Sequence, residues 1–106
     1  MTKGSRTAAG WSIEDIDRMV HEPARYLILS LLYVLESGDF LFIQNQSGLT
    51  KGNLSSHISK LEDAGYVRVV KRFVGKKPHT MLKITPAGRM AFEDYRRTMS
   101  GIIGIK

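Results

Sequence analysis

Residues 50–73 read TKGNLSSHISKLEDAGYVRVVKRF and join a helix pattern to a strand pattern across one glycine. Thr50 suits a helix N-cap, and Gly65 suits a left-handed helix terminator. The β-branched and aromatic residues of 66–73 predict a strand. We therefore expect a helix over about 50–64 that leads directly into a β-strand. The apolar residues of this helix recur at the i, i+4, i+7 spacing of a buried face: Leu54, Ile58 and Leu61.

The residues after this segment predict the rest of a hairpin and a last helix. Residues 74–78, VGKKP, have the composition of a turn, and residues 79–85 carry the apolar residues of a second strand. Pro86 suits the first turn of a helix whose apolar residues recur as far as Met99. Glycines interrupt the apolar residues of 101–106, which we expect to form a tail.

The start of the chain predicts a short amphipathic helix. Residues 1–11 are mostly small and polar, and we expect them to be flexible. Ser12 and Asp15 have the spacing of an N-terminal capping pair, which predicts a helix from there to about Val20.

The bounds of the next two elements are predicted from the proline and glycine residues that start and end them. Pro23 suits the first position of the most hydrophobic helix, which we expect to run to residue 37 with Gly38 as its C-cap. Residues 39–48 predict a short extended piece and then a brief helix that ends at Gly48. The element order predicts a single α+β domain over residues 12–100.

The composition describes one domain with an uneven charge. A chain of 106 residues, 42% of them hydrophobic, can build one core but not two. Residues 1–48 carry four Lys or Arg against six Asp or Glu, a net charge of −2, whereas residues 49–106 carry twelve against four, a net charge of +8. The total of +6 and the pI of about 9.8 favour partners that carry phosphate.

Several classes of protein are excluded or disfavoured. The absence of cysteine excludes disulfides, zinc–thiolate sites and cysteine nucleophiles. Apolar runs are too short for a secretory signal or a membrane span, so we expect a cytoplasmic protein with no membrane partner. The three histidines share no metal-ligand spacing, and phosphate-loop and hydrolase motifs are absent. We expect no enzymatic activity, no metal and no cofactor.

The outward face of the 50–64 helix is small and polar, as a helix that enters the major groove of DNA requires. Gly52 would let backbone amides approach a phosphate, Asn53 could pair with adenine, and Lys51 or Lys60 with guanine or phosphate. The alternative is an ordinary solvated face, which the preceding short helix makes less favoured, because that pairing defines a helix-turn-helix. The predicted DNA contacts on this helix are Thr50, Lys51, Gly52, Asn53, Ser55, Ser56, Ser59 and Lys60.

The hairpin supplies a second indication of DNA binding. Its basic residues fall within sixteen positions without one acidic residue, and they could contact phosphates or the minor groove. The alternative is a set of edge-strand lysines that prevent aggregation, for which one or two would suffice. The predicted contacts are Arg68, Lys71, Arg72, Lys76, Lys77 and His79, with Lys83 as a further basic residue.

Apolar residues near both ends of the domain exceed what a small core needs. They could complete the core of the single chain or join a second copy, and we favour a homodimer. The predicted dimer contacts are Ile13, Ile16, Val20, Phe92, Tyr95, Met99, Ile102 and Ile103.

Three segments resemble winged helix-turn-helix transcriptional regulators of the MarR/ArsR type, in their short single-domain branch. They are PARYLILSLL at 23–32, LSSHISKLEDAGYV at 54–67 and LKITPAGR at 82–89. The resemblance covers about residues 12–97. It implies a three-helix core with a β-hairpin wing and extra N- and C-terminal helices.

The resemblance also implies a mode of binding to double-stranded DNA. The first and last helices would interlock in a dimer, the 50–64 helix would enter the major groove, and the 73–79 wing would touch the minor groove. The chain departs from the pattern in its lack of the cysteines of metal sensors, and at FLFIQNQ, 40–46, where the family has a more regular helix.

Two rival functions remain at this stage. A winged helix can dock proteins instead of DNA, which predicts little sensitivity to salt. RNA binding is disfavoured because no aromatic platform for stacking is evident. The identity of any small-molecule effector is unknown, and we expect it, if there is one, at the dimer interface.

Overall fold

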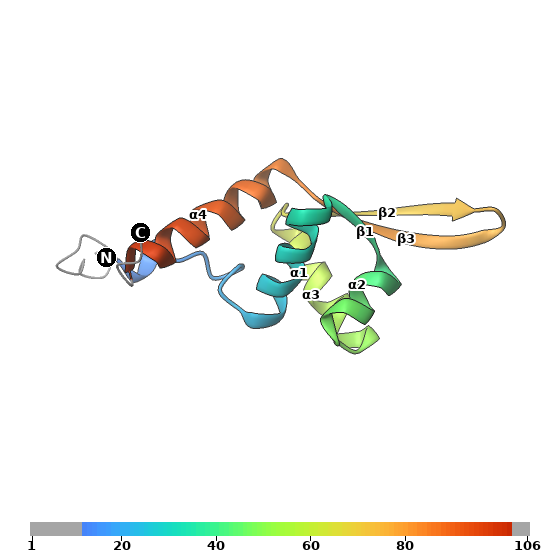
Figure 1. The fold of residues 1–106 in the computed structure, drawn as a ribbon, viewed down its shortest axis with the longest axis horizontal. Helices are drawn as coiled ribbons and strands as arrows, with labels where there is room; N and C mark the ends of the chain where they lie inside the picture. The colour runs from blue at the N-terminus through green and yellow to red at the C-terminus, as the bar shows by residue number, and fades with distance from the viewer. Residues whose placement is uncertain (1–11, 103–106) are drawn as a thin grey trace.

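The computed structural model describes residues 12–102, and its helices pack beside a small antiparallel sheet (Figure 1). Residues 1–11, predicted to be flexible, and Ile103, predicted at the dimer interface, lie outside the described residues. The elements in chain order are the 3-10 helix η1 (Ile13–Asp15), α1 (Pro23–Leu35), β1 (Ser37–Asp39), α2 (Phe40–Ser47), α3 (Lys51–Asp63), β2 (Val67–Val74), β3 (Lys77–Ile84) and α4 (Pro86–Ile102).

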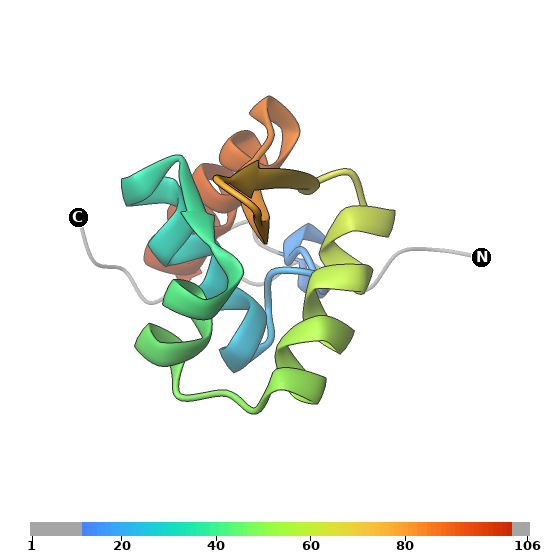
Figure 2. The ribbon, with the colours of Figure 1, turned by 90° about the vertical axis from the view of Figure 1, so that its right-hand side faces the viewer.

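The core forms where α1, α2 and α3 meet the base of the sheet. Viewed from the hairpin end, α2 and α3 lie on either side of α1 (Figure 2). Ile28, Leu29 and Leu32 of α1 are fully buried against the apolar stripe predicted on α3. The buried apolar residues are Val20, Ile28, Leu29, Leu32, Ile43, Leu54, Ile58, Leu61, Val67, Leu82 and Phe92.

The sheet has the strand order β1-β3-β2, with antiparallel pairing throughout. Strands β2 and β3 form a hairpin in which Val74 pairs with Lys77, so the turn consists of Gly75 and Lys76 alone. Gly75 has a φ of +64°, which favours glycine at the first central position of a tight hairpin turn. The strands are therefore longer, and the turn shorter, than the predicted 74–78.

The prediction of a helix from Ser12 to about Val20 is wrong. The capping box of Ser12 and Asp15 forms, but only η1 follows it. The carboxylate of Asp17 then accepts hydrogen bonds from the backbone N–H groups of Met19 (2.8 Å) and Val20 (3.3 Å), which turns the chain. A side chain that binds nearby backbone donors in this way competes with helix formation.

The end of α1 also differs from the prediction. Pro23 and the N-cap Glu22 start the helix as expected, but it ends at Leu35, and Glu36 takes the positive φ of 67°. Gly38 is not a C-cap; it is buried in β1, where an added Cβ would lie 2.9 Å from Cδ1 of Ile43. The predicted extended piece is thus Ser37–Asp39, which pairs with β3 as a third strand.

A tight junction joins the wing to α4. The hydroxyl of Thr85 accepts from the backbone N–H of Gly88 (2.9 Å) and donates to the carbonyl of Gly65 (2.6 Å). The backbone N–H of Thr85 donates to the carbonyl of Tyr66 at 3.0 Å. At Gly88 an added Cβ would lie 2.1 Å from that same Tyr66 oxygen. Only glycine allows α4 to pass this close to the end of α3.

We expect Gly88→Ala to destabilise the protein by about 3 kcal/mol or more, at the upper end of the cost of overpacking, because the clash is with backbone that cannot rotate away. Urea-induced unfolding measures the change. Gly52→Ala is the matched control: an added Cβ there meets nothing within 4 Å, and alanine inside a helix should stabilise by about 0.5–1 kcal/mol. Equal stability of Gly88→Ala and the wild type would contradict the close packing.

Candidate nucleic-acid interface

Helices α2 and α3 form a helix-turn-helix whose turn is set by local hydrogen bonds. Gly48 ends α2 in the left-handed conformation with φ of 74°, as predicted. Thr50 caps α3, because its hydroxyl accepts from the backbone N–H of Asn53 at 3.1 Å. The other end of α3 is closed by Gly65, whose φ is 82°. Both predicted ends of α3 are therefore confirmed.

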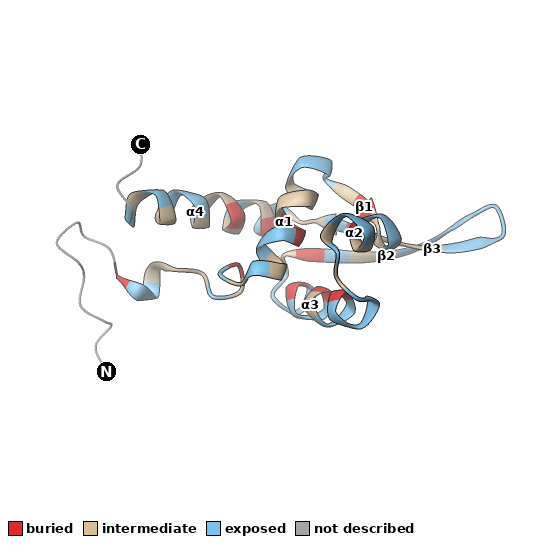
Figure 3. Cartoon of the chain, turned by 60° about the horizontal axis from the view of Figure 1, so that its bottom comes forward, coloured by how far each residue is buried: buried red, intermediate tan, exposed pale blue. Residues whose placement is uncertain are grey.

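The face of α3 away from the core is open to solvent. In Figure 3 most of the helix has the colour of exposed residues, with short buried stretches between them. At 100° per residue around the helix axis, the residues of this face fall on two flanks. Lys51, Ser55 and Ser59 lie on the side of the hairpin, where they line a shared groove. Asn53 and Lys60 lie on the opposite flank. All eight predicted contacts of this segment are exposed: Thr50, Lys51, Gly52, Asn53, Ser55, Ser56, Ser59 and Lys60.

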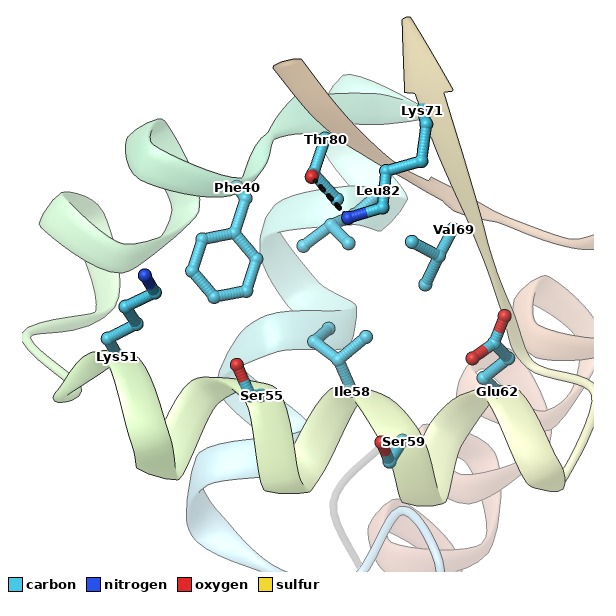
Figure 4. A pocket seen from close by; sticks show the side chains of 10 residues that line it. All are labelled: Phe40, Lys51, Ser55, Ile58, Ser59, Glu62, Val69, Lys71, Thr80 and Leu82. Atoms are coloured by element: carbon cyan, nitrogen blue, oxygen red, sulfur yellow. Dashed lines mark hydrogen bonds between the residues drawn. The ribbon is translucent and has the colours of Figure 1, made fainter. Parts of the chain in front are cut away.

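The groove between α3 and the sheet has a volume of about 370 Å³ (Figure 4). Phe40 of α2 and Leu82 of β3 contribute to its wall, and Lys71 of β2 lines it on the side of the sheet. The Lys71 ammonium donates to the Thr80 hydroxyl at 3.1 Å, which holds its charge on the α3 side of the hairpin. Lys71 therefore shares a surface with the predicted recognition residues of α3.

The other basic residues of the hairpin do not all share that surface. Successive side chains of a strand point to opposite faces. Arg68, Arg72 and Lys83 accordingly line a second hollow with Val70 and Met81, on the face away from α3. The hairpin residues predicted to contact DNA are therefore divided: Arg68 and Arg72 lie on the face away from α3, while Lys76 and Lys77 lie at the exposed tip.

His79 has a structural partner. Its Nδ1 lies 2.9 Å from Oδ1 of Asp39, across the edge of the sheet. Asp39 also accepts from the backbone N–H of Leu41 at 3.0 Å and so caps α2. The hydrogen bond from His79, more than any other influence, lowers the pKa of the Asp39 carboxyl. This pair ties the wing to the start of α2.

Sequence reasoning missed two residues near the interface. Arg25, at the start of α1, donates to the Met19 carbonyl at 2.7 Å and lies 3.2 Å from Nδ1 of His57, so its guanidinium stands beside α3. Thirty-two residues separate Arg25 from His57 in sequence, and no local pattern connects them. Phe73 is 71% exposed near the wing tip, where it pairs with Pro78 of β3; its place directly before the predicted turn at 74–78 is the signal that could have found it.

Acidic residues limit the interface at one end. Glu62 and Asp63 are exposed on the last turn of α3, and they form no ion pair within residues 12–102. A polyanion is therefore expected to contact the N-terminal part of the helix, where the side chains are small, neutral or cationic.

The predicted dimer residues fall into two groups. Val20 and Phe92 lie in the core of the single chain, so the prediction that they contact a second copy is wrong for these two. Tyr95 binds Nδ1 of His21 at 2.7 Å and packs on Tyr26, which anchors α4 to α1. The remaining described members keep free surface: Ile13 (63% exposed), Ile102 (40%), and the half-buried Ile16 and Met99.

Tyr66 secures the other side of the junction near α4. Its hydroxyl donates to the Asp17 carboxylate at 2.6 Å, which holds the N-terminal segment beside the wing. Burial and then this hydrogen bond raise the pKa of Tyr66 to about 12. Within residues 12–102, no helix has the length and apolar character to cross a bilayer, and no three potential ligands gather as a metal site would need.

Comparison with known families decides the identity of this arrangement. Residues 24–103 match the model of the winged helix DNA-binding domain. The chain belongs to this family. The predicted winged helix-turn-helix fold is confirmed, with the helices and the three-stranded sheet placed as the family requires. The winged helix is a DNA-binding fold and not an enzyme fold, in agreement with the prediction that this chain is no enzyme.

Individual relatives agree with the family. An uncharacterised protein of Methanocaldococcus jannaschii, MJ0432, is 38% identical over 78 residues, 74% of this chain and 85% of the relative. A transcriptional regulator homologue from Pyrococcus horikoshii superposes with a TM-score of 0.78 at 30% identity, over 83% of this chain and 87% of that one. AbfR bound to DNA shares the fold, with a TM-score of 0.72 at 18% identity, over 84% of this winged helix chain and 64% of AbfR.

Proposed function

We propose that this winged helix protein is a dimeric transcriptional regulator that binds specific sequences in double-stranded DNA. In this proposal α3 enters the major groove, and the tip of the wing contacts the minor groove or the backbone beside it. The observation that carries the proposal is the exposed face of α3, where small polar side chains and two lysines surround a glycine.

The shape of α3 supports entry into the major groove. The groove admits one helix, and bulky side chains on its outer face would hold the helix away from the bases. Gly52 has open space around its Cα, and Ser55, Ser56 and Ser59 add little volume. Asn53 can donate to and accept from an adenine edge, which gives the helix a residue able to read sequence.

The electrostatics support the same orientation. Lys51, Lys71 and the tip residues Lys76 and Lys77 are exposed on the α3 side or at the end of the hairpin. They would contact phosphates, which contribute affinity without sequence information. The acidic residues at the C-terminal end of α3 would repel the phosphates of the DNA backbone, so the N-terminal end of the helix would lie closer to the DNA.

The relatives support a regulatory role. The protein from Pyrococcus horikoshii is named as a transcriptional regulator homologue. AbfR, which shares the fold, has a crystal structure in which it is bound to DNA. A cytoplasmic location is consistent with contact between such a regulator and DNA. The proposed dimer would place two α3 helices about one helical turn of DNA apart, on a palindromic site.

The first prediction concerns the phosphate contacts of the wing tip. Lys76→Ala with Lys77→Ala should weaken binding to all DNA sequences alike, and should flatten the plot of log affinity against log salt by about 0.9 for each phosphate contact removed. Fluorescence anisotropy across a salt series measures both. Lys83→Ala, at the base of the same hairpin and far from the tip, is the control and should leave the slope unchanged. A similar loss of slope in both proteins would contradict the assigned orientation.

The second prediction concerns the reading of bases. Asn53→Ala should cost about 1–3 kcal/mol on the preferred sequence and little on random DNA, if its amide pairs with an adenine edge. A selection on random duplexes followed by competition assays measures the ratio. Ser56→Ala tests the same face without removing an amide. Full selectivity of Asn53→Ala would exclude this contact.

The third prediction concerns the dimer. The distal half of α4 projects away from the helical body, beside the N-terminal segment (Figure 1), and it leaves Ile13 and Ile102 exposed. Ile13→Glu with Ile102→Glu should keep the fold but sediment as a monomer, because a charge there cannot be buried in the interface. Val34→Glu changes an 80% exposed residue of α1 and should remain dimeric. Dissociation by Val34→Glu alone would move the interface to α1.

A further inference from the structure

The face of the hairpin that points away from α3 carries a regular pattern of charge. Along β2 it presents Arg68, Val70 and Arg72, which are alternate residues and therefore lie in one row about 7 Å apart. Along β3 it presents Lys83 and Met81 directly opposite the first two. The surface is thus a cationic end at Arg68 and Lys83, an apolar floor of Val70 and Met81, and a second end where Arg72 lies opposite His79.

The cations of this face are not neutralised inside the chain. Arg68 and Lys83 are cross-strand partners, and like charges placed directly opposite each other destabilise a sheet. Neither these two nor Arg72 forms an ion pair with any residue between 12 and 102. Asp39 lies at the same edge, but it is held by His79 at 2.9 Å. An anion between the strands would relieve the repulsion.

The apolar floor distinguishes this face from a phosphate-binding surface. Val70 and Met81 are only half-buried and line a hollow of about 250 Å³ together with the three cations. A DNA backbone would leave them without an apolar partner. A peptide can satisfy both parts, because in an extended chain the side chains at i, i+2 and i+4 share one face and repeat at the spacing of β2 itself.

We propose that this face, defined by Arg68, Val70, Arg72, Met81 and Lys83, binds an extended acidic segment of a partner protein. The segment has two carboxylate side chains four positions apart and one apolar side chain midway. The carboxylates bind the two arginines, which can take them in bidentate geometry, and the apolar side chain fills the hollow over Val70 and Met81. The site lies across the hairpin from α3, so a regulator bound to DNA could hold this partner at the same time.

The probe for the test is a synthetic fluorescent peptide with two glutamates four positions apart, a leucine midway, and threonines elsewhere. The protein variant is Arg68→Gln with Arg72→Gln and Lys83→Gln. The matched control removes three charges from the α3 side of the molecule and from the hairpin turn: Lys51→Gln with Lys71→Gln and Lys76→Gln. Circular dichroism establishes that both triple variants are folded.

We expect the Arg68, Arg72 and Lys83 variant to bind the peptide at least about tenfold more weakly than the wild type and to keep its DNA affinity. The control should show the reverse pattern. Replacement of the peptide leucine by serine, or of both glutamates by glutamine, should also weaken binding to the wild type. In the intact protein, amide shifts on titration should cluster at Val70 and Met81.

Three outcomes would overturn the proposal. Equal loss of peptide binding in both triple variants would show non-specific attraction, and indifference of the wild type to the loss of the glutamates would remove the charge argument. Loss of DNA binding by the Arg68, Arg72 and Lys83 variant would assign this face to DNA. The proposed DNA function fails separately, if the wild type itself lacks salt-dependent DNA binding.

Discussion

Burial of one side of α3 is the constraint on which the rest of the interface depends. Leu54, Ile58 and Leu61 are almost completely inaccessible to solvent, and their removal from water contributes about 1.5–3 kcal/mol each. Because these three side chains define the inward side, the rotation of the helix about its axis is set. The small polar side chains must then point outward, and no separate interaction is needed to present them.

The junction at Tyr66 transmits this placement to the wing and to α4. Its backbone N–H donates to the carbonyl of Leu61, its carbonyl accepts from Thr85, and its hydroxyl donates to Asp17. Gly88 packs against the same carbonyl. One residue therefore ties the end of α3 to the start of the hairpin, the start of α4 and the N-terminal segment. The position of the wing relative to α3 follows from this contact.

The hairpin serves two surfaces because a strand has two faces. Lys71 and Thr80 face α3 and line the groove beside it, whereas Arg68 and Arg72 face the opposite side with Lys83. A high density of positive charge in this segment does not by itself indicate a single binding site. Here the positive charges belong to two surfaces of different chemistry. One lies beside the small polar side chains of α3, and the other surrounds the apolar residues Val70 and Met81.

Local signals by themselves determined α3, its Thr50 cap, the Gly48 and Gly65 terminators and the wing, since each depends on residues within a few positions of one another. The tertiary structure decided what depends on distant partners. Gly38 is a strand residue because it pairs with Leu82 of β3, and Val20 and Phe92 belong to the core because segments distant in sequence bury them. The division of the hairpin cations into two faces required the strand register and the position of α3. Sequence spacing encodes which residues alternate, but only the packed fold establishes what lies against each side.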